Sequence, residues 1–221
     1  LLVHGLDPES PQHANRLTNA EYHLARERMG ALVHIAAPVM DRLFSAVGDS
    51  GCSVVLTDRA GIIIERRGKP GDDASFQHWG LWNGADWSES REGTNGIGTA
   101  LISETPTLVH ADEHFMHANH FLTCSAAPIL DPRGNILGVL DVSGDQRSYH
   151  QHTMALVRMS ARMIENHWLS DDYRHVMRLH FHNRAEFIGT LMEGILAVTP
   201  DGKIVGANRS ALDQLAMSGA A

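Results

Sequence analysis

Cysteine is scarce in this chain, where Cys52 and Cys124 are the only two thiols among 221 residues. Two thiols cannot build a disulfide framework, and a structural zinc site needs more ligands than they supply. We therefore expect both thiols to be reduced, as is usual in the cytoplasm. No cofactor motif stands out, and we predict that no cofactor is bound.

Basic residues are outnumbered, since 18 lysines and arginines face 26 acidic residues and the net charge is −8. Binding to nucleic acid needs a basic surface, so this balance disfavours direct contact with DNA or RNA. Hydrophobic residues make up 43% and charged residues 20%. These proportions are typical of a globular protein and exclude a wholly disordered chain.

Long apolar runs are also missing. The most apolar early stretch, Ala31–Met40, contains His34 and Pro38 and is about half the length of a membrane span. The first residues lack the basic region and apolar core of a signal peptide. We predict no contact with a membrane and a cytoplasmic location.

Hydrophobic spacing and turn residues predict a mixed fold. A helix is expected from Asn19, Gly30 breaks it, and a second helix with Leu32, Ile35 and Val39 on one face ends at Gly48. The predicted strands are Cys52–Thr57, Ile62–Arg66, Thr107–His110, Leu122–Leu130 and Ile136–Ser143. A short helix, Thr94–Ser103, is expected between the second and the third of these strands. Strands joined by hairpins indicate an antiparallel sheet with helices packed on it, an α+β fold.

The last third of the chain predicts a long helix and the start of a second domain. A helical pattern runs over 148–183, and Leu169, Tyr173 and Val176 form a second apolar stripe. The pattern fits two helices with a break near Ser170, or one helix whose second half meets a partner. Further helices are expected over 184–192 and 207–216, around a hairpin. We predict four parts: an arm (1–18), a sensory domain (19–147), a linker and dimerisation helix (148–183) and a truncated domain (184–221).

Three groups of residues could carry chemistry. The glycine-rich segment 91–100 has no lysine, so a tight entry into a helix is favoured over a phosphate loop. Four histidines lie within 110–120, and we expect one or two of them to donate hydrogen bonds into a pocket, with a metal site as the weaker alternative. Cys124 lies in an apolar strand, where cysteine is usually a small core residue, so nucleophilic catalysis lacks support and no enzyme is predicted.

Four blocks now resemble a known family. They are REGTNGIGT (91–99), VHADEHF (109–115), TCSAAPI (123–129) and LGVLDVSG (137–144). In this order they look like the sensory GAF domain of acetoin-catabolism-regulator-type activators, which are bacterial sigma-54-dependent transcription regulators. The segment GILAVTPDGKIVGAN (194–208) is similar to the opening of a PAS domain.

The resemblance implies a sheet of about six antiparallel strands, a small-molecule pocket, and homodimers joined through helices. It implies that sigma-54 RNA polymerase and DNA are contacted only through an AAA+ ATPase and a helix-turn-helix that this chain does not contain. Cyclic-nucleotide-binding, bilin-binding and sulfoxide-reducing GAF domains fit less well, because their signature residues do not occur here.

We therefore expect a sensor that binds a small carbonyl or polyol metabolite and relays its presence to the output domains. The alternative is a GAF–PAS module that docks a regulatory protein and has no small ligand. The residues expected at the ligand, from the four blocks and the tryptophan-rich loop before them, are Trp79, Trp82, Thr94, Asn95, Ile97, His110, His114, Phe115 and Cys124.

Overall fold

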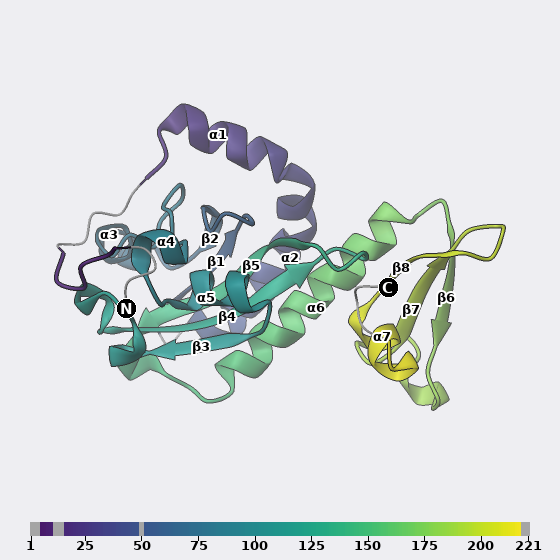
Figure 1. Ribbon diagram of the computed structural model, residues 1–221. Helices are drawn as coiled ribbons and strands as arrows, with labels where there is room; N and C mark the ends of the chain where they lie inside the picture. The colour runs from purple at the N-terminus through teal and green to yellow at the C-terminus, as the bar shows by residue number, and fades with distance from the viewer. Residues whose placement is uncertain (1–4, 11–15, 49–50, 218–221) are drawn as a thin grey trace.

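The computed structural model describes residues 5–10, 16–48 and 51–217. Two units follow each other along the chain and are joined by one long helix (Figure 1). The helices and strands are α1 (Asn19–Arg28), α2 (Gly30–Val47), β1 (Cys52–Thr57), β2 (Ile63–Arg67), α3 (Asp73–His78), α4 (Glu89–Glu92), α5 (Gly96–Ser103), β3 (Thr107–His110), β4 (Leu122–Leu130), β5 (Ile136–Asp145), α6 (Thr153–Asp172), β6 (Met177–Phe181), β7 (Gly194–Val198), β8 (Ile204–Ala207) and α7 (Arg209–Leu215).

The first unit is built on an antiparallel sheet with the strand order β2-β1-β5-β4-β3. The described residues give this sheet five strands, one fewer than the six expected. Its hairpin turns follow from local chemistry, since the Asp131 carboxylate accepts the backbone N–H groups of Arg133 and Asn135 and closes the β4–β5 turn. The α+β architecture predicted from the sequence is confirmed.

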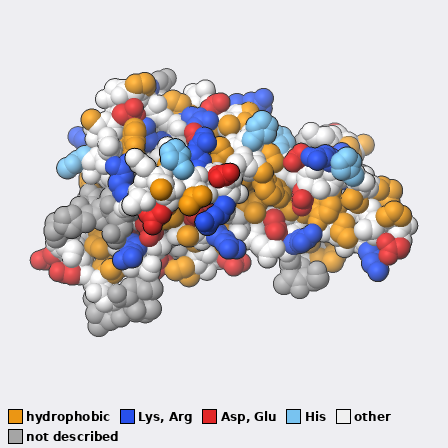
Figure 2. Space-filling view, turned by 90° about the horizontal axis from the view of Figure 1, so that it is seen from above, with side chains coloured by type: hydrophobic (Ala, Val, Ile, Leu, Met, Phe, Trp, Pro, Cys, Tyr) orange, Lys and Arg blue, Asp and Glu red, His pale blue; other side chains and the backbone are white. Residues whose placement is uncertain are grey.

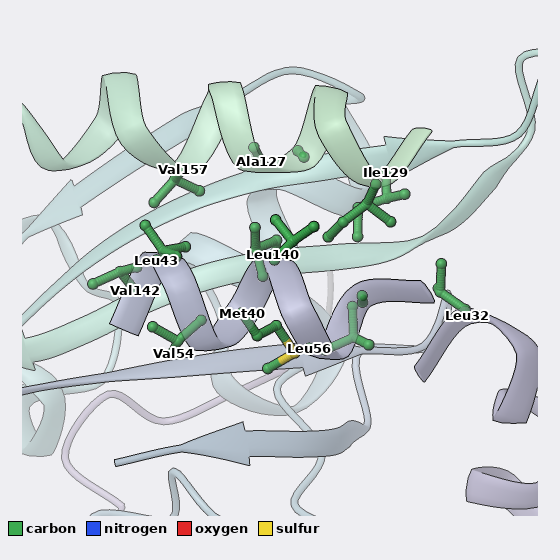
Figure 3. Close-up of a cluster of buried hydrophobic side chains, with 14 of the residues drawn as sticks. Leu32, Met40, Leu43, Val54, Leu56, Ala127, Ile129, Leu140, Val142 and Val157 are labelled. Carbon is green, nitrogen blue, oxygen red and sulfur yellow. The ribbon is translucent and has the colours of Figure 1, made fainter. Parts of the chain in front are cut away.

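One face of this sheet is covered by α2 and α6 (Figure 3). Met40 and Leu43 of α2 and Val157 of α6 pack against strand residues such as Leu56 and Leu140, and all five are buried. Each such side chain contributes about 1.5–3 kcal/mol by leaving water. By length and composition α2 is also apolar enough to cross a membrane. Its buried stripe on the sheet is that of a core helix.

The N-terminal helix begins at Asn19, as the sequence predicts. Thr18, not Asn19, is the N-cap, and it forms a capping box with Glu21. The predicted arm 1–18 lies partly outside the described residues. Its described part is tied to the first unit, because Leu17 N donates to Gly84 O at 2.9 Å and His117 N donates to Pro8 O at 3.0 Å.

Of the two alternatives for 148–183, the break near Ser170 lies close to the observed end of the helix, but the helix expected after it is wrong. α6 ends at Asp172, and residues 177–181 form strand β6. Tyr173 is the C-cap residue of α6, with φ −107° and ψ 29°, and its hydroxyl donates to Val205 O at 2.6 Å, which ties this end of the helix to the second unit. Leu169, Tyr173 and Val176 pack in that unit. The apolar stripe that motivated a dimer helix is thus covered within the chain.

The second unit is a three-stranded antiparallel sheet in the order β6-β7-β8, with α7 packed on β7. The helix predicted over 184–192 is not formed, because this stretch contains one 3₁₀ turn (Ala185–Phe187) and further turns around Gly189 at φ 82°. The helix predicted over 207–216 is confirmed as α7, capped by the Asn208 side chain. These elements continue directly from α6.

Candidate functional site

The other face of the first sheet carries polar side chains within an apolar layer. Asp141 and Ser143 alternate with the core residues Leu140 and Val142 on β5, so they point away from α2 and α6. Ser143 pairs with Cys124 of β4 in the strand register. Together with His114 from the loop after β3, these residues form a buried group that we call the polar cluster: His114, Cys124, Asp141 and Ser143.

Hydrogen bonds join the polar cluster into one chain. His114 Nδ1 lies 3.0 Å from Ala111 O, so it carries the ring proton, and Nε2 at 3.4 Å from Cys124 Sγ is left to accept. The Ser143 hydroxyl lies 3.1 Å from Cys124 Sγ and also contacts Asp141 Oδ2. One hydroxyl proton cannot serve both neighbours. A protonated Asp141 would donate to Ser143, which then donates to Cys124, whose thiol donates to His114.

Burial sets the ionisation of this cluster. It raises the pKa of Asp141 from 3.8 to about 7, against a smaller lowering by the bond from Ser143. Burial also raises the pKa of the Cys124 thiol, so that this cysteine is a core thiol and no nucleophile. It lowers the pKa of His114, which favours the neutral ring. Asp141 therefore keeps its proton below about pH 7, and the cluster gains a negative charge as the pH rises through that value.

One oxygen of the cluster is unsatisfied. Asp141 Oδ1 is buried and has no hydrogen-bond partner among the described residues. An unpaired buried oxygen costs about 1–3 kcal/mol, so this atom is a candidate contact for a bound group.

The glycine-rich segment brings α5 close to this cluster. A side chain at Gly96 would lie 2.6 Å from Cys124 Cβ, and one at Gly98 would lie 2.6 Å from Glu89 N. Asn95 caps α5 by accepting from Gly98 N at 2.9 Å. The glycines therefore serve close packing of a helix on the sheet, which is the tight entry that the sequence favoured over a phosphate loop.

The histidines of 110–120 do not gather. The segment forms two 3₁₀ turns, not the helix on which a shared face would depend. His110 lies against the Tyr149 ring, His114 is buried in the polar cluster, and the His117 and His120 rings contact each other. On the surface seen in Figure 2, histidines are spread out. Within the part of the chain that the structure describes, no three metal-binding side chains converge.

The tryptophans lie along the apolar layer. Trp79 packs on Phe76 and Phe121, with ring centroids 5.1 and 4.9 Å apart. Trp87 is buried, and its indole N–H donates to Gly80 O at 2.8 Å. This hydrogen bond links the two ends of the loop between them. Trp82 lies against Arg66. The segment 68–93, expected to be irregular, contains the short helices α3 and α4.

Several predicted ligand residues come together. His114 contacts Cys124 directly, Phe115 N donates to Thr94 O at 3.0 Å, and Phe115 fills the space over Gly93. Asn95 and Ile97 complete this group from α5, with Ile97 in the same apolar layer as Cys124. Trp79 and Trp82 pack against the edge of the same apolar layer, Trp79 beside Phe121 and Trp82 beside Arg66, whereas His110 lies beside Tyr149.

Sequence reasoning missed Asp141 and Ser143 as site residues. A signal was present, because a carboxylate in the middle of the apolar strand VLDVS is unusual unless a partner or a ligand satisfies it.

A cavity of about 190 Å³ lies elsewhere, at the joint between the two units. Four charged residues line it, Asp131, Arg133, Glu165 and Arg209; Glu165 and Arg209 are already paired at 2.7 Å, and Glu165 also accepts from Leu130 N at 2.8 Å. Ala207 N donates to Pro132 O at 3.1 Å across the same joint. Glu165 and Arg209 have their partners, in contrast to Asp141, so we place the candidate site at the polar cluster.

Known proteins resemble this chain over most of its length. A family model described as "GAF domain" matches residues 31–168. The acetoin catabolism regulatory protein of Cupriavidus necator is 34% identical over 212 residues, covering 94% of this chain and 32% of that protein. The acetoin dehydrogenase operon transcriptional activator AcoR of Bacillus subtilis is 29% identical over 160 residues, covering 72% and 24%. The chain thus spans about a third or less of these relatives.

A solved structure shares the arrangement of both units. In the complex of E. coli DhaR(N) with DhaL, one chain superposes with a TM-score of 0.73 at 18% identity, over 98% of this chain and 75% of that one. This similarity supports the order and packing of the elements described above.

Proposed function

Since the chain belongs to the GAF domain family, we propose that it is the signal-sensing region of a bacterial transcriptional activator and that a small carbonyl or polyol metabolite binds at the polar cluster. The observation that carries this proposal is the buried, unpartnered oxygen of Asp141. Oδ1 accepts a hydroxyl of a ligand in either charge state, because the proton of the neutral acid lies on Oδ2 and is donated to Ser143. Small ligands of this kind need a few placed polar groups within an apolar wall.

The relatives support the regulatory part of the proposal. Two that match over most of this chain are named as regulators of acetoin catabolism and of an acetoin dehydrogenase operon. We propose that this chain also senses on behalf of output domains that contact sigma-54 polymerase and DNA, that it catalyses no reaction, and that it works as a cytoplasmic homodimer. We assign β6 to α7 to the opening of a PAS domain, on the likeness of 194–208 noted above.

The route from ligand to output follows the chain. β5 carries Asp141 and Ser143, and α6 follows it after one 3₁₀ turn. α6 packs on β4 and supplies Glu165 to the joint with the second unit. A ligand that binds one arrangement of the polar cluster more tightly shifts the population of that arrangement. We propose that this shift reaches the second unit through α6.

A thermal-shift assay on this chain with acetoin, dihydroxyacetone and glycerol tests the proposal. At a ligand concentration of 100 Kd, binding stabilises the fold by about 2.7 kcal/mol, which raises Tm by roughly 5–10 °C for a chain of this size. His114→Ala should weaken this response, because it removes the ring that accepts from Cys124. The matched control is His117→Ala, since His117 is exposed and lies outside the polar cluster.

Two results would count against the proposal. Equal responses of wild type, H114A and H117A would show that the ligand binds away from the polar cluster. No response to any small compound would favour the alternative, in which the chain docks a regulatory protein, as the DhaR(N) chain is seen with DhaL.

A further inference from the structure

Arg66 is a buried arginine at the edge of the apolar layer. It lies on β2, and its side chain is only 8% exposed. The guanidinium carbon lies 4.8 Å from the centroid of the Phe76 ring and 4.8 Å from that of Trp82. Gly68 makes room for it, because a Cβ there would lie 2.2 Å from Arg66 Nη2. The guanidinium of Arg66 is thus packed against two aromatic rings and the backbone of Gly68.

Only one side of this guanidinium is used. Nη1 donates to Asp73 Oδ1 at 2.7 Å, which ties β2 to α3. Nε and Nη2 are both buried, and neither has an acceptor among the described residues. These two nitrogens form the edge that arginine uses to hold two neighbouring oxygen atoms at once. Arg67, the next residue, has no such spare edge, because Nε donates to Asp41 and Nη1 donates to Glu65.

Charge decides what kind of oxygen fits. The positive charge of Arg66 is already balanced by Asp73, so a second carboxylate would bring an excess negative charge into the apolar layer. Neutral oxygens satisfy both donors without that cost. We infer that Arg66 binds the two adjacent oxygens of a small neutral compound, an α-hydroxyketone or a vicinal diol, in the effector site.

The position of Arg66 relates it to the polar cluster. Arg66 pairs with Val55, and Val55 pairs with Asp141, so the three share one row across the sheet. Two strand spacings separate the backbones of Arg66 and Asp141 by about 10 Å. Arg66 and Asp141 therefore carry their side chains on the same face of the sheet, on either side of the buried Val55. This inference rests on the proposed function, and it adds the chemical class of the effector.

Helix α3 packs on Arg66 and couples its own position to ligand binding. α3 supplies Asp73 and Phe76, and both contact Arg66. A ligand that satisfies Nε and Nη2 while leaving the bond to Asp73 intact stabilises the arrangement with α3 in place. Ligand binding and the packing of α3 on the sheet are then coupled through the Arg66 side chain.

Isothermal titration calorimetry of this chain with acetoin and with 2-butanone tests the inference. The two compounds share a carbon skeleton, but 2-butanone lacks the second oxygen. Wild type should bind acetoin about tenfold more tightly, as expected for the extra hydrogen bond. Arg66→Met removes the donors and keeps the bulk between the rings. Gly68→Ala keeps Arg66 but displaces its guanidinium group. It therefore tests the contact between this guanidinium and the ligand without removing the positive charge.

Both variants should bind the two compounds equally, within about twofold, whereas the control Arg67→Met should keep the wild-type preference. If R66M and G68A retain the preference for acetoin, Arg66 is not the receptor, although the proposed function stands. If wild type binds acetate more tightly than acetoin, the charge argument is overturned. If wild type binds none of these compounds, this inference fails, whereas the proposed function still stands when dihydroxyacetone or glycerol raises Tm.

Discussion

Asp141 gives the most quantitative prediction. The unfolded chain ionises this carboxyl near its ordinary pKa of 3.8, whereas burial raises the pKa in the folded chain to about 7. Between these values the folded protein holds a proton that the unfolded chain releases. Its contribution to stability is therefore fully present below pH 3.8 and is lost as the pH rises through 7. At 1.36 kcal/mol per unit of pKa, the whole loss is about 4 kcal/mol.

Asp141→Asn removes this titration and keeps an oxygen that can accept from Ser143. Urea denaturation of wild type and D141N at pH 5, 6, 7 and 8 measures the difference in free energy of unfolding. We expect that difference to shift in favour of D141N by about 3 kcal/mol between pH 5 and pH 8, with most of the change below pH 7. Subtracting the two proteins removes the contribution of His114, whose pKa burial lowers.

Asp145→Asn is the matched control on the same strand. Arg147 holds the pKa of the Asp145 carboxyl below its ordinary value, so this group is ionised in both states above pH 5. D145N should change the stability by the same amount at every pH tested. A difference between wild type and D141N that is also constant from pH 5 to pH 8 would refute the reasoning, because Asp141 would then titrate as it does in water.

Three further variants test the packing. Arg209→Met leaves Glu165 buried without its partner and should cost about 3–5 kcal/mol of unfolding free energy in urea denaturation. Asn95→Ala removes the buried cap of α5 and should lower the same quantity by about 1–2 kcal/mol. Gly138→Ala places a Cβ 1.9 Å from Thr57 O, and the resulting strain should cost about 3 kcal/mol. Losses under about 0.5 kcal/mol would contradict each account.

Local patterns predicted most of the first unit. The stripe of α2 and the turn at Asp131 depend on neighbours in sequence, so helix spacing and turn chemistry were sufficient to find them. The end of α6 depends on a distant partner, because the Tyr173 hydroxyl meets Val205 more than thirty residues away. The alternation of apolar and polar residues in MRLHF (177–181) was the local signal for β6, and a helical stripe running into it concealed it.

The site was harder to predict than the fold. His114 and Cys124 were expected at the ligand, and the structure brings them into contact. Asp141 and Arg66 were not expected, because what distinguishes them is a buried polar atom without a partner among the described residues, which only the packed sheet creates. Trp82 was assigned to the pocket for its aromatic character. Its contact with Arg66 gives it a physical role that sequence spacing alone could not show.

A crystal structure of this chain grown with saturating acetoin tests the central claim most directly. We predict electron density for the ligand on the sheet face that carries the polar cluster, with one ligand oxygen within hydrogen-bond distance of Asp141 Oδ1. Density in the cavity of about 190 Å³ between the two units, beside Glu165 and Arg209, with the Asp141 oxygen still unpartnered, would contradict the account.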